Sequence, residues 1–420
     1  MKIVYIFGAG ASASIDERVP VMANFFEKAV DMLDEDNKVF WITFAFAEEA
    51  RAFPSNPEIE NLGVQMGALG RLYLEKIEKS KISIDIVQSV KNTDDIIRGK
   101  LADAIIDYKK AFLKDNKRKS ANLEDVFSKM EAFKERSSVA DQTYDRLQYV
   151  INRLFYQLNE DLQDKFSVAA HHELSQFVAN TKDVEHIFIS FNYDLWLEKA
   201  LFKKGLWNPR DGHGSYVFQY YLPPLNDVTP ENETTIIGNL NEPKEFSYNS
   251  QDSKVKVLKP HGSLAWRCGT NNPDNLVVIL ENGENSCVTY NNAWSLPSSI
   301  FQENAELFII PLIVPPIPNK IRSHPLFWAT DKNVYNALLH ADIVVIVGWS
   351  MPLSDRYLQD IIFKALNNRE EQIRKLIICD KQAADEHLLS KFEGIFRPLE
   401  IKSWLYGFSR EFIDFLKKEL

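Results

Sequence analysis

The amino-acid sequence predicts an α/β protein with a Rossmann-like, mostly parallel sheet and a large inserted helical domain. Residues 2–7 form a β-rich apolar run that leads directly into Gly8. Residues 342–347 are almost wholly apolar, which is typical of a central parallel strand buried on both faces. Across residues 37–180, strand-like runs nearly vanish, and lysine, glutamate, alanine and leucine recur at helical periods.

The length of the chain favours two folding units. At 420 residues it exceeds the size at which a single hydrophobic core usually stops growing. We therefore assign residues 1–36 and 181–420 to one α/β domain and residues 37–180 to a helical insertion.

The individual elements follow in chain order. Strand 2–7, a glycine turn and a short loop precede a helix over 23–33, which starts late because Val19-Pro20 intervenes. Within the insertion, helices are predicted over 72–77, 96–112, 123–133 and 147–162. Beyond it, strands are predicted over 187–190, 255–258, 307–314, 342–347, 376–379 and 399–404, and helices over 195–202 and 409–418. The polar region 207–256 predicts an irregular excursion with room for hairpins.

Composition excludes several classes of function. The net charge is 49 − 59 = −10, which disfavours a broad basic surface for binding the phosphates of nucleic acid. No sequence-specific nucleic-acid binding is therefore expected. Three cysteines without a C-x-x-C pair exclude a disulfide scaffold and a four-cysteine zinc site within one chain. Residues 2–7 are too short for a signal sequence, and no segment reaches the ~18 apolar residues of a membrane helix. We expect a cytoplasmic protein that does not enter a membrane.

The first candidate site segment is Gly8-Ala9-Gly10-Ala11-Ser12, directly after the first strand. Its glycines permit a tight turn and close backbone approach, and the Ser12 hydroxyl can donate to a phosphate oxygen. The segment lacks the third glycine of the dinucleotide fingerprint, and an ordinary strand-to-helix turn is the alternative. The position after the first strand favours phosphate binding.

The second segment is Ser190-Phe191-Asn192-Tyr193-Asp194. Asn192 and Asp194 follow the carboxyl end of a strand, where open α/β sheets place their ligands. Asn192 can hold a water or a ribose hydroxyl, and Asp194 can orient it or stabilise oxocarbenium character. Either residue can instead serve as a helix N-cap, and both interpretations can hold together.

The third segment is Lys259-Pro260-His261-Gly262-Ser263. We expect the tight turn to direct the His261 side chain outward, where a neutral imidazole can accept a proton from a ribose hydroxyl or from water. The alternative is a buried histidine that satisfies the backbone of its turn. The presence of the other two segments in the same chain favours a catalytic role for His261 over a structural one.

Two later loops complete the set. Gly348 and Ser350 follow the strongest strand and can bring donors to a dinucleotide; an ordinary connection capped by Ser354 or Asp355 is the alternative. Asp380 ends the next strand and can hold an adenosine ribose, although turn residues often look the same. The pair His171-His172 lacks a metal-type partner and predicts a solvated helix end.

Taken together, these segments resemble the sirtuin superfamily, and specifically its bacterial sirtuin-like NAD-hydrolase branch of anti-phage defence. Sirtuins open with a Gly-Ala-Gly-x-Ser loop, matched by Gly8 to Ser12, and carry an Asn-x-Asp segment, matched by Asn192 and Asp194. Their catalytic histidine precedes a glycine, as His261 does, and their late Gly-x-Ser loop matches residues 348–350. The resemblance covers roughly residues 1–35 and 185–405.

The departures from that family narrow the expected activity. Protein-deacylating sirtuins continue with Pro-Asp-Phe-Arg, where this chain reads Val19-Pro20-Val21-Met22, and they carry four zinc cysteines that this chain cannot supply. The resemblance further implies depletion of NAD upon infection, in homo-oligomers or beside partner ATPases or phage-sensing proteins. Residues 123–128 and 315–320 are similar to the same defence branch.

The sequence therefore predicts an NAD⁺ glycohydrolase that releases nicotinamide and ADP-ribose, with NAD⁺ as substrate and no zinc. Asn192 positions the water or ribose, His261 is the general base and Asp194 the orienting residue. The cofactor-binding residues are Gly8, Ala9, Gly10, Ser12, Ser190, Gly348, Ser350 and Asp380, and no metal ligand is expected. Alternatives are an NAD-dependent protein deacylase or ADP-ribosyltransferase, and a non-catalytic nucleotide-sensing subunit of a defence complex.

Overall fold

The computed structural model describes residues 1–32, 123–124, 127–128, most of 151–207, 233–239, 255–269, 275–281, 309–314 and 325–420. By backbone contacts the chain divides into two compact units. The first comprises Met1–Val19, Leu158–Val314 and Pro318–Leu420, and the second comprises Pro20–Gln157 and Pro315–Ile317.

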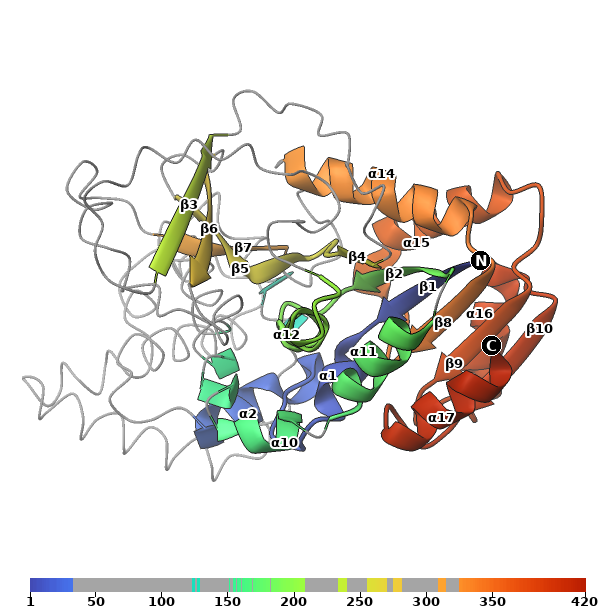
Figure 1. The fold of residues 1–420 in the computed structure, drawn as a ribbon, viewed down its shortest axis with the longest axis horizontal. Coiled ribbons are helices and arrows are strands. Elements are labelled where there is room, and N and C mark those ends of the chain that lie inside the picture. The colour runs from blue at the N-terminus through green and yellow to red at the C-terminus, as the bar shows by residue number, and fades with distance from the viewer. Residues whose placement is uncertain are drawn as a thin grey trace, which may run out of the picture. The chain divides into compact units, whose positions relative to one another are not determined.

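A six-stranded sheet forms the core of the first unit (Figure 1). Its order is β10-β9-β8-β1-β2-β4, and every neighbouring pair is parallel. The strands are β1 (Lys2–Phe7), β2 (Glu185–Ser190), β4 (Val255–Leu258), β8 (Ile343–Val347), β9 (Lys375–Cys379) and β10 (Glu400–Trp404). Buried β-branched and aromatic residues build the inner strands, as burial on both faces requires. The protein is thus an α/β protein with a parallel sheet, as predicted.

Helices cover both faces of this sheet. Because strand side chains alternate, Ile3, Tyr5 and Phe7 face one layer while Val4 and Ile6 face the other. The first layer contains α11 (Ala170–Asn180), α12 (Trp196–Lys203) and α17 (Arg410–Glu419). The opposite layer contains α14 (Pro325–Leu339), α15 (Arg356–Asn367) and α16 (Glu386–Phe396). Figure 1 shows α14 and α15 on one side and α11 and α17 on the other.

The same unit contains a second sheet, whose strands lie before and after β4 in the chain. It has the order β3-β6-β5-β7 with antiparallel pairs. The strands are β3 (Glu233–Asn239), β5 (Gly262–Gly269), β6 (Asn275–Glu281) and β7 (Ile309–Ile313). His261 lies in the turn between β4 and β5, so it occupies the junction where the chain passes from one sheet to the other.

The predicted strands and the helices over 195–202 and 409–418 are confirmed within a few residues. The loop predicted after Gly8 is wrong, because a short helix α1 (Ala9–Ala13) begins at once. In the second unit, the predicted helix near 23–33 is present as the 3-10 helix η1 (Met22–Asn24) and α2 (Phe25–Met32). The second sheet was not predicted.

The predicted insertion, residues 37–180, falls largely outside the described residues, since residues 33–122 are not among them. The segment 315–320, which was predicted to resemble the defence branch, also lies outside the described residues. The described residues of the insertion between 123 and 159 are helical, as predicted. Helices α10 (Gln163–Ser167) and α11, which lie within the predicted insertion, belong by their contacts to the first unit. The domain boundaries at 36/37 and 180/181 stay predictions. Within the described residues, no helix combines the length and apolar character needed to cross a membrane.

Two histidines, His171 and His186, are buried in the first unit, and the first of them corrects an expectation. His171 is not at a solvated helix end: it is 1% exposed, and its ring contacts those of Phe7 and Phe408. His186 on β2 is equally buried and lies with its Nδ1 3.0 Å from the Tyr5 hydroxyl. Burial lowers the pKa of His171 to about 3 and that of His186 to about 4. Both rings are therefore neutral in the folded protein near pH 7.

These histidines predict acid sensitivity. A histidine whose pKa is lowered in the folded state stabilises the protein fully at pH values above its unfolded-state pKa of about 6.5. This stabilisation is lost as the pH falls toward the folded-state pKa of about 4. The shift of His186 corresponds to about 3 kcal/mol of unfolding free energy over that range. The variant His186→Asn keeps an acceptor for Tyr5. Between pH 6.5 and 4, we expect its free energy of unfolding, measured in urea, to fall less than that of the wild type.

The matched control is His340→Asn at an exposed position, which should behave like the wild type. Equal acid sensitivity of His186→Asn and the wild type would show that this ring stays uncharged in both states.

Candidate active site

The predicted site residues gather where parallel strands end. Gly8 follows β1, Asn192 and Asp194 follow β2, His261 follows β4, and Gly348 follows β8. The strand order reverses its direction between β1 and β8, and open α/β sheets bind ligands beyond the strand ends at such a point. Asp380 follows β9 at the next strand end.

Close backbone packing explains the glycines of two of these loops. A Cβ atom at Gly8 would lie 2.5 Å from the Gly348 carbonyl oxygen, and one at Gly10 would lie 2.7 Å from the Gly348 Cα. Gly348 itself has φ +59°, and a Cβ there would lie 2.5 Å from the Ala11 nitrogen. The glycines therefore allow the backbones of the loops after β1 and β8 to pack directly against each other.

The same packing uses several backbone amides. Gly8 donates to Val347 O, and Gly10 donates to Gly348 O, at 2.9 and 3.0 Å. Gly348 in turn donates to Cys379 O at 2.9 Å. Among the described residues, no backbone carbonyl accepts from the amide of Ala9, the first residue of α1. In this conformation the amides of both Gly8 and Gly10 are therefore used within the protein.

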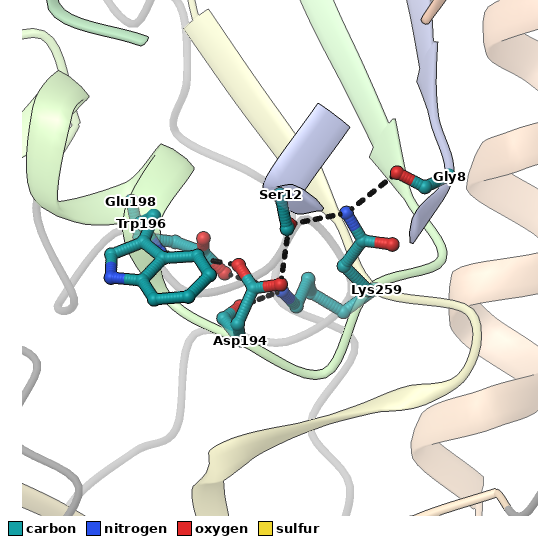
Figure 2. A network of polar contacts seen from close by, with 7 residues as sticks. Gly8, Ser12, Asp194, Trp196, Glu198 and Lys259 are labelled. Carbon is teal, nitrogen blue, oxygen red and sulfur yellow. Dashed lines mark hydrogen bonds and ion pairs between the residues drawn. The ribbon is translucent and has the colours of Figure 1, made fainter. Parts of the chain in front are cut away.

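Asn192 joins two of the loops through its amide nitrogen. Nδ2 donates to Gly8 O at 2.9 Å and to the Ser12 hydroxyl at 2.8 Å. Ser12 in turn donates to Asp194 Oδ2 at 2.6 Å, so the single proton of this hydroxyl is used within the protein (Figure 2). Ser12 therefore holds the site together in this conformation instead of donating to a phosphate.

Asp194 is a buried part of this network. It is 4% exposed, and its Oδ1 lies 3.4 Å from the Trp196 amide at the start of α12, a long contact that gives only weak capping. Burial raises the pKa of Asp194, while the Lys259 charge and the Ser12 hydrogen bond oppose that rise. The side chain thus fixes Ser12 and α12 and is withdrawn from a ligand.

Beneath Asp194 lies an ion pair that sequence reasoning missed. Lys259 and Glu198 are both 0% exposed, and Lys259 Nζ lies 2.9 Å from Glu198 Oε1. The same Nζ donates to the Asp194 carbonyl at 2.6 Å (Figure 2). One feature of the sequence could have indicated this ion pair: Lys259 is a charged residue directly after a predicted buried strand, where its charge needs a partner.

His261 is buried, not directed outward as predicted, because two neighbours hold its ring. It is 6% exposed; Nδ1 lies 3.2 Å from Phe191 O, and Nε2 lies 3.0 Å from Asp355 Oδ1. The Phe191 ring lies beside it, with centroids 5.2 Å apart. Its turn requires Gly262, which has φ +82°.

Asp355 does not cap a helix with its side chain, which was the alternative considered for this loop. It occupies the N-cap position of α15 without a side-chain capping bond, and its Oδ2 accepts from Trp349 Nε1 at 3.1 Å. This carboxylate therefore links the β8 loop to His261.

The remaining predicted residues lie in different surroundings. Ser190 is buried at the end of β2, Ser350 is exposed, and Asp380 is half-buried with its Oδ1 accepting from the Gln382 amide at 2.8 Å. The structure gives none of these three a contact with Asn192 or His261. The described residues include no group of three or more His, Cys, Asp or Glu that could hold a metal ion.

Comparison with known proteins does not assign a family. No protein-family model matches the sequence, and no curated protein matches it either. Functional inference therefore depends on the residues and on their geometry.

The buried ion pair of Lys259 and Glu198 allows a test by unfolding experiments. Lys259→Met leaves Glu198 charged and buried, which should lower the free energy of unfolding by about 3–5 kcal/mol. Adding Glu198→Leu removes the uncompensated charge, so the double variant should regain most of that loss in urea unfolding followed by tryptophan fluorescence. A double variant no more stable than Lys259→Met alone would contradict this coupling.

Proposed function

We propose that the protein is a sirtuin-like NAD⁺ glycohydrolase built on a Rossmann-like sheet, which cleaves NAD⁺ to nicotinamide and ADP-ribose. The strand order supports the Rossmann-like assignment, because it matches the order 3-2-1-4-5-6 of doubly wound dinucleotide-binding sheets. The arrangement of the three loops at the strand ends supports the site.

The orientation of the Asn192 amide carries this proposal. Both of its N–H groups are used by Gly8 O and Ser12 Oγ, which fixes the side chain. The oxygen, Oδ1, is then the atom presented to a ligand, and an amide oxygen accepts a hydrogen bond from a ribose hydroxyl or a water. An acceptor held in place at the strand ends can orient the attacking group near C1′.

The other residues take roles that suit their surroundings. His261 is the general base, held by Phe191 and Asp355 beside Asn192. Asp194 orients the site indirectly, through Ser12 and Asn192, because it is buried. Ala9 offers its amide to the pyrophosphate, and Ser350 offers an exposed hydroxyl.

The expected setting belongs to the same proposal. A cytoplasmic enzyme of this activity would deplete NAD⁺ during anti-phage defence and would need control by homo-oligomerisation, a partner ATPase or a phage-sensing protein. No zinc is needed for glycosidic cleavage by these residues.

The direct test is nicotinamide release from NAD⁺ by purified protein. Asn192→Ala should lower the rate by about 10²–10⁴-fold, because the orienting acceptor is lost. Asn367→Ala, at an exposed asparagine of α15, is the matched control and should keep the wild-type rate. Melting temperatures of both variants separate loss of chemistry from loss of fold.

An Asn192→Ala variant that is folded and cleaves NAD⁺ at the wild-type rate would refute the role of Asn192. Wild-type protein that binds NAD⁺ and releases no nicotinamide, alone or in extracts of phage-infected cells, would favour the nucleotide-sensing alternative.

A further inference from the structure

Asp355 bridges two ring N–H donors that come from different parts of the chain. Its Oδ1 lies 3.0 Å from His261 Nε2, and its Oδ2 accepts from Trp349 Nε1 at 3.1 Å. The indole nitrogen is only a donor, so Oδ2 must accept there. All three residues are buried, with exposures of 3% for Asp355, 6% for His261 and 2% for Trp349.

The loop that carries Asp355 is tightly held. Met351 has φ +55°, a left-handed conformation that is costly for a residue with a Cβ. Its carbonyl accepts from Lys391 Nζ at 2.5 Å, and Gln359 Nε2 donates to the Pro352 carbonyl at 2.8 Å. The Asp355 amide also donates to Pro352 O at 3.0 Å. The carboxylate therefore has a fixed position relative to β8.

We propose that Asp355 is a positioning residue that fixes the tautomer of His261, keeping the ring proton on Nε2 so that Nδ1 is the proton-accepting nitrogen. A carboxylate can only accept, so the neutral ring gains a hydrogen bond by placing its proton on Nε2. The contact of Nδ1 with Phe191 O is longer, at 3.2 Å, and a carbonyl cannot supply a proton to that nitrogen.

The chemical consequence rests on the proposed glycohydrolase function. As a water oxygen bonds to C1′, the C1′–N bond breaks and its electron pair leaves with neutral nicotinamide. For the water to reach Nδ1, the contact of this nitrogen with Phe191 O must open; the water O–H bond then breaks, and its proton passes to His261 Nδ1 and later to solvent. The resulting imidazolium donates from Nε2 to Asp355 and from Nδ1 to Phe191 O, so both acceptors stabilise the charged ring.

The charged and titratable groups around the ring are consistent with this role. Asp355 is the last residue of the 3-10 helix η4 (Leu353–Asp355), directly before α15. The Tyr193 ring lies 6.3 Å from the His261 ring between centroids, and its hydroxyl donates to Val314 O. Lys259, from the same turn as His261, directs its charge to Glu198. Asp355 thus places a carboxylate oxygen 3.0 Å from an imidazole nitrogen.

The variant Asp355→Asn tests the tautomer directly. Because Trp349 Nε1 demands an acceptor, the introduced amide should turn its oxygen to Trp349 and its NH₂ to His261 Nε2. The ring proton should then move to Nδ1, where Phe191 O can accept it. Two-bond ¹⁵N–¹H correlations of the imidazole should show the Nε2–H form in the wild type and the Nδ1–H form in the variant.

A second substitution provides the control. Adding Trp349→Phe removes the indole donor, so the introduced amide can turn its oxygen toward Nε2 and restore the Nε2–H form. The wild-type spectrum alone remains decisive if a variant fails to fold: a neutral ring protonated on Nδ1 in the wild type overturns the inference. An unchanged tautomer in folded Asp355→Asn overturns it as well.

The activity measurement separates this inference from the proposed function. Asp355→Asn should lower kcat for nicotinamide release by about 10²–10⁴-fold with KM for NAD⁺ within about threefold, and the double variant should recover part of kcat. If wild-type protein releases no nicotinamide, the glycohydrolase proposal fails while the tautomer result still decides the role of Asp355. A tautomer change without loss of kcat overturns the catalytic consequence.

Discussion

The arrangement of the site depends on a buried chain of polar contacts around Asp194. Glu198 holds the Lys259 ammonium, Lys259 holds the Asp194 carbonyl, and the Asp194 carboxylate holds Ser12. Ser12 accepts from Asn192, which also reaches Gly8. The chain ties the ends of β1, β2 and β4 together inside a region that excludes water. Removal of one charge would leave another buried without compensation, so the network is constrained as a unit.

A second constraint joins the remaining loop. Gly8 and Gly10 lie against Gly348, and the left-handed backbone of Gly348 lets the β8 loop turn back toward α1. The next residues of that loop carry Trp349 and then Asp355, which reach His261. Backbone packing on one side and the Asp194 network on the other thus hold the loops that carry Asn192 and His261. His261 Nδ1 lies 3.2 Å from the carbonyl oxygen of Phe191, the residue before Asn192.

The sequence predicted the parallel strands better than the contacts made by the side chains that follow them. Hydrophobic runs predicted the parallel strands because their burial leaves an almost uninterrupted apolar pattern, and motif residues placed Asn192 and His261 correctly at strand ends. Roles that depend on partners distant in sequence were not accessible. Lys259 with Glu198, and Asp355 with His261, become pairs only when the chain folds. Of the antiparallel sheet, only β7 was predicted, as the strand over 307–314. β3 was missed because residues 207–256 carry a polar, turn-rich composition.

We propose that Asn192 Oδ1 faces the nicotinamide ribose at the ends of β1, β2 and β8. A crystal structure of the His261→Ala variant soaked with NAD⁺ tests it most directly, because loss of the proposed base should leave the dinucleotide intact. We expect Oδ1 within hydrogen-bond distance of a ribose hydroxyl or of a water near C1′, with Ser12 still bonded to Asp194. NAD⁺ bound elsewhere, or bound here with its nicotinamide ribose away from Asn192, would refute this role of Asn192.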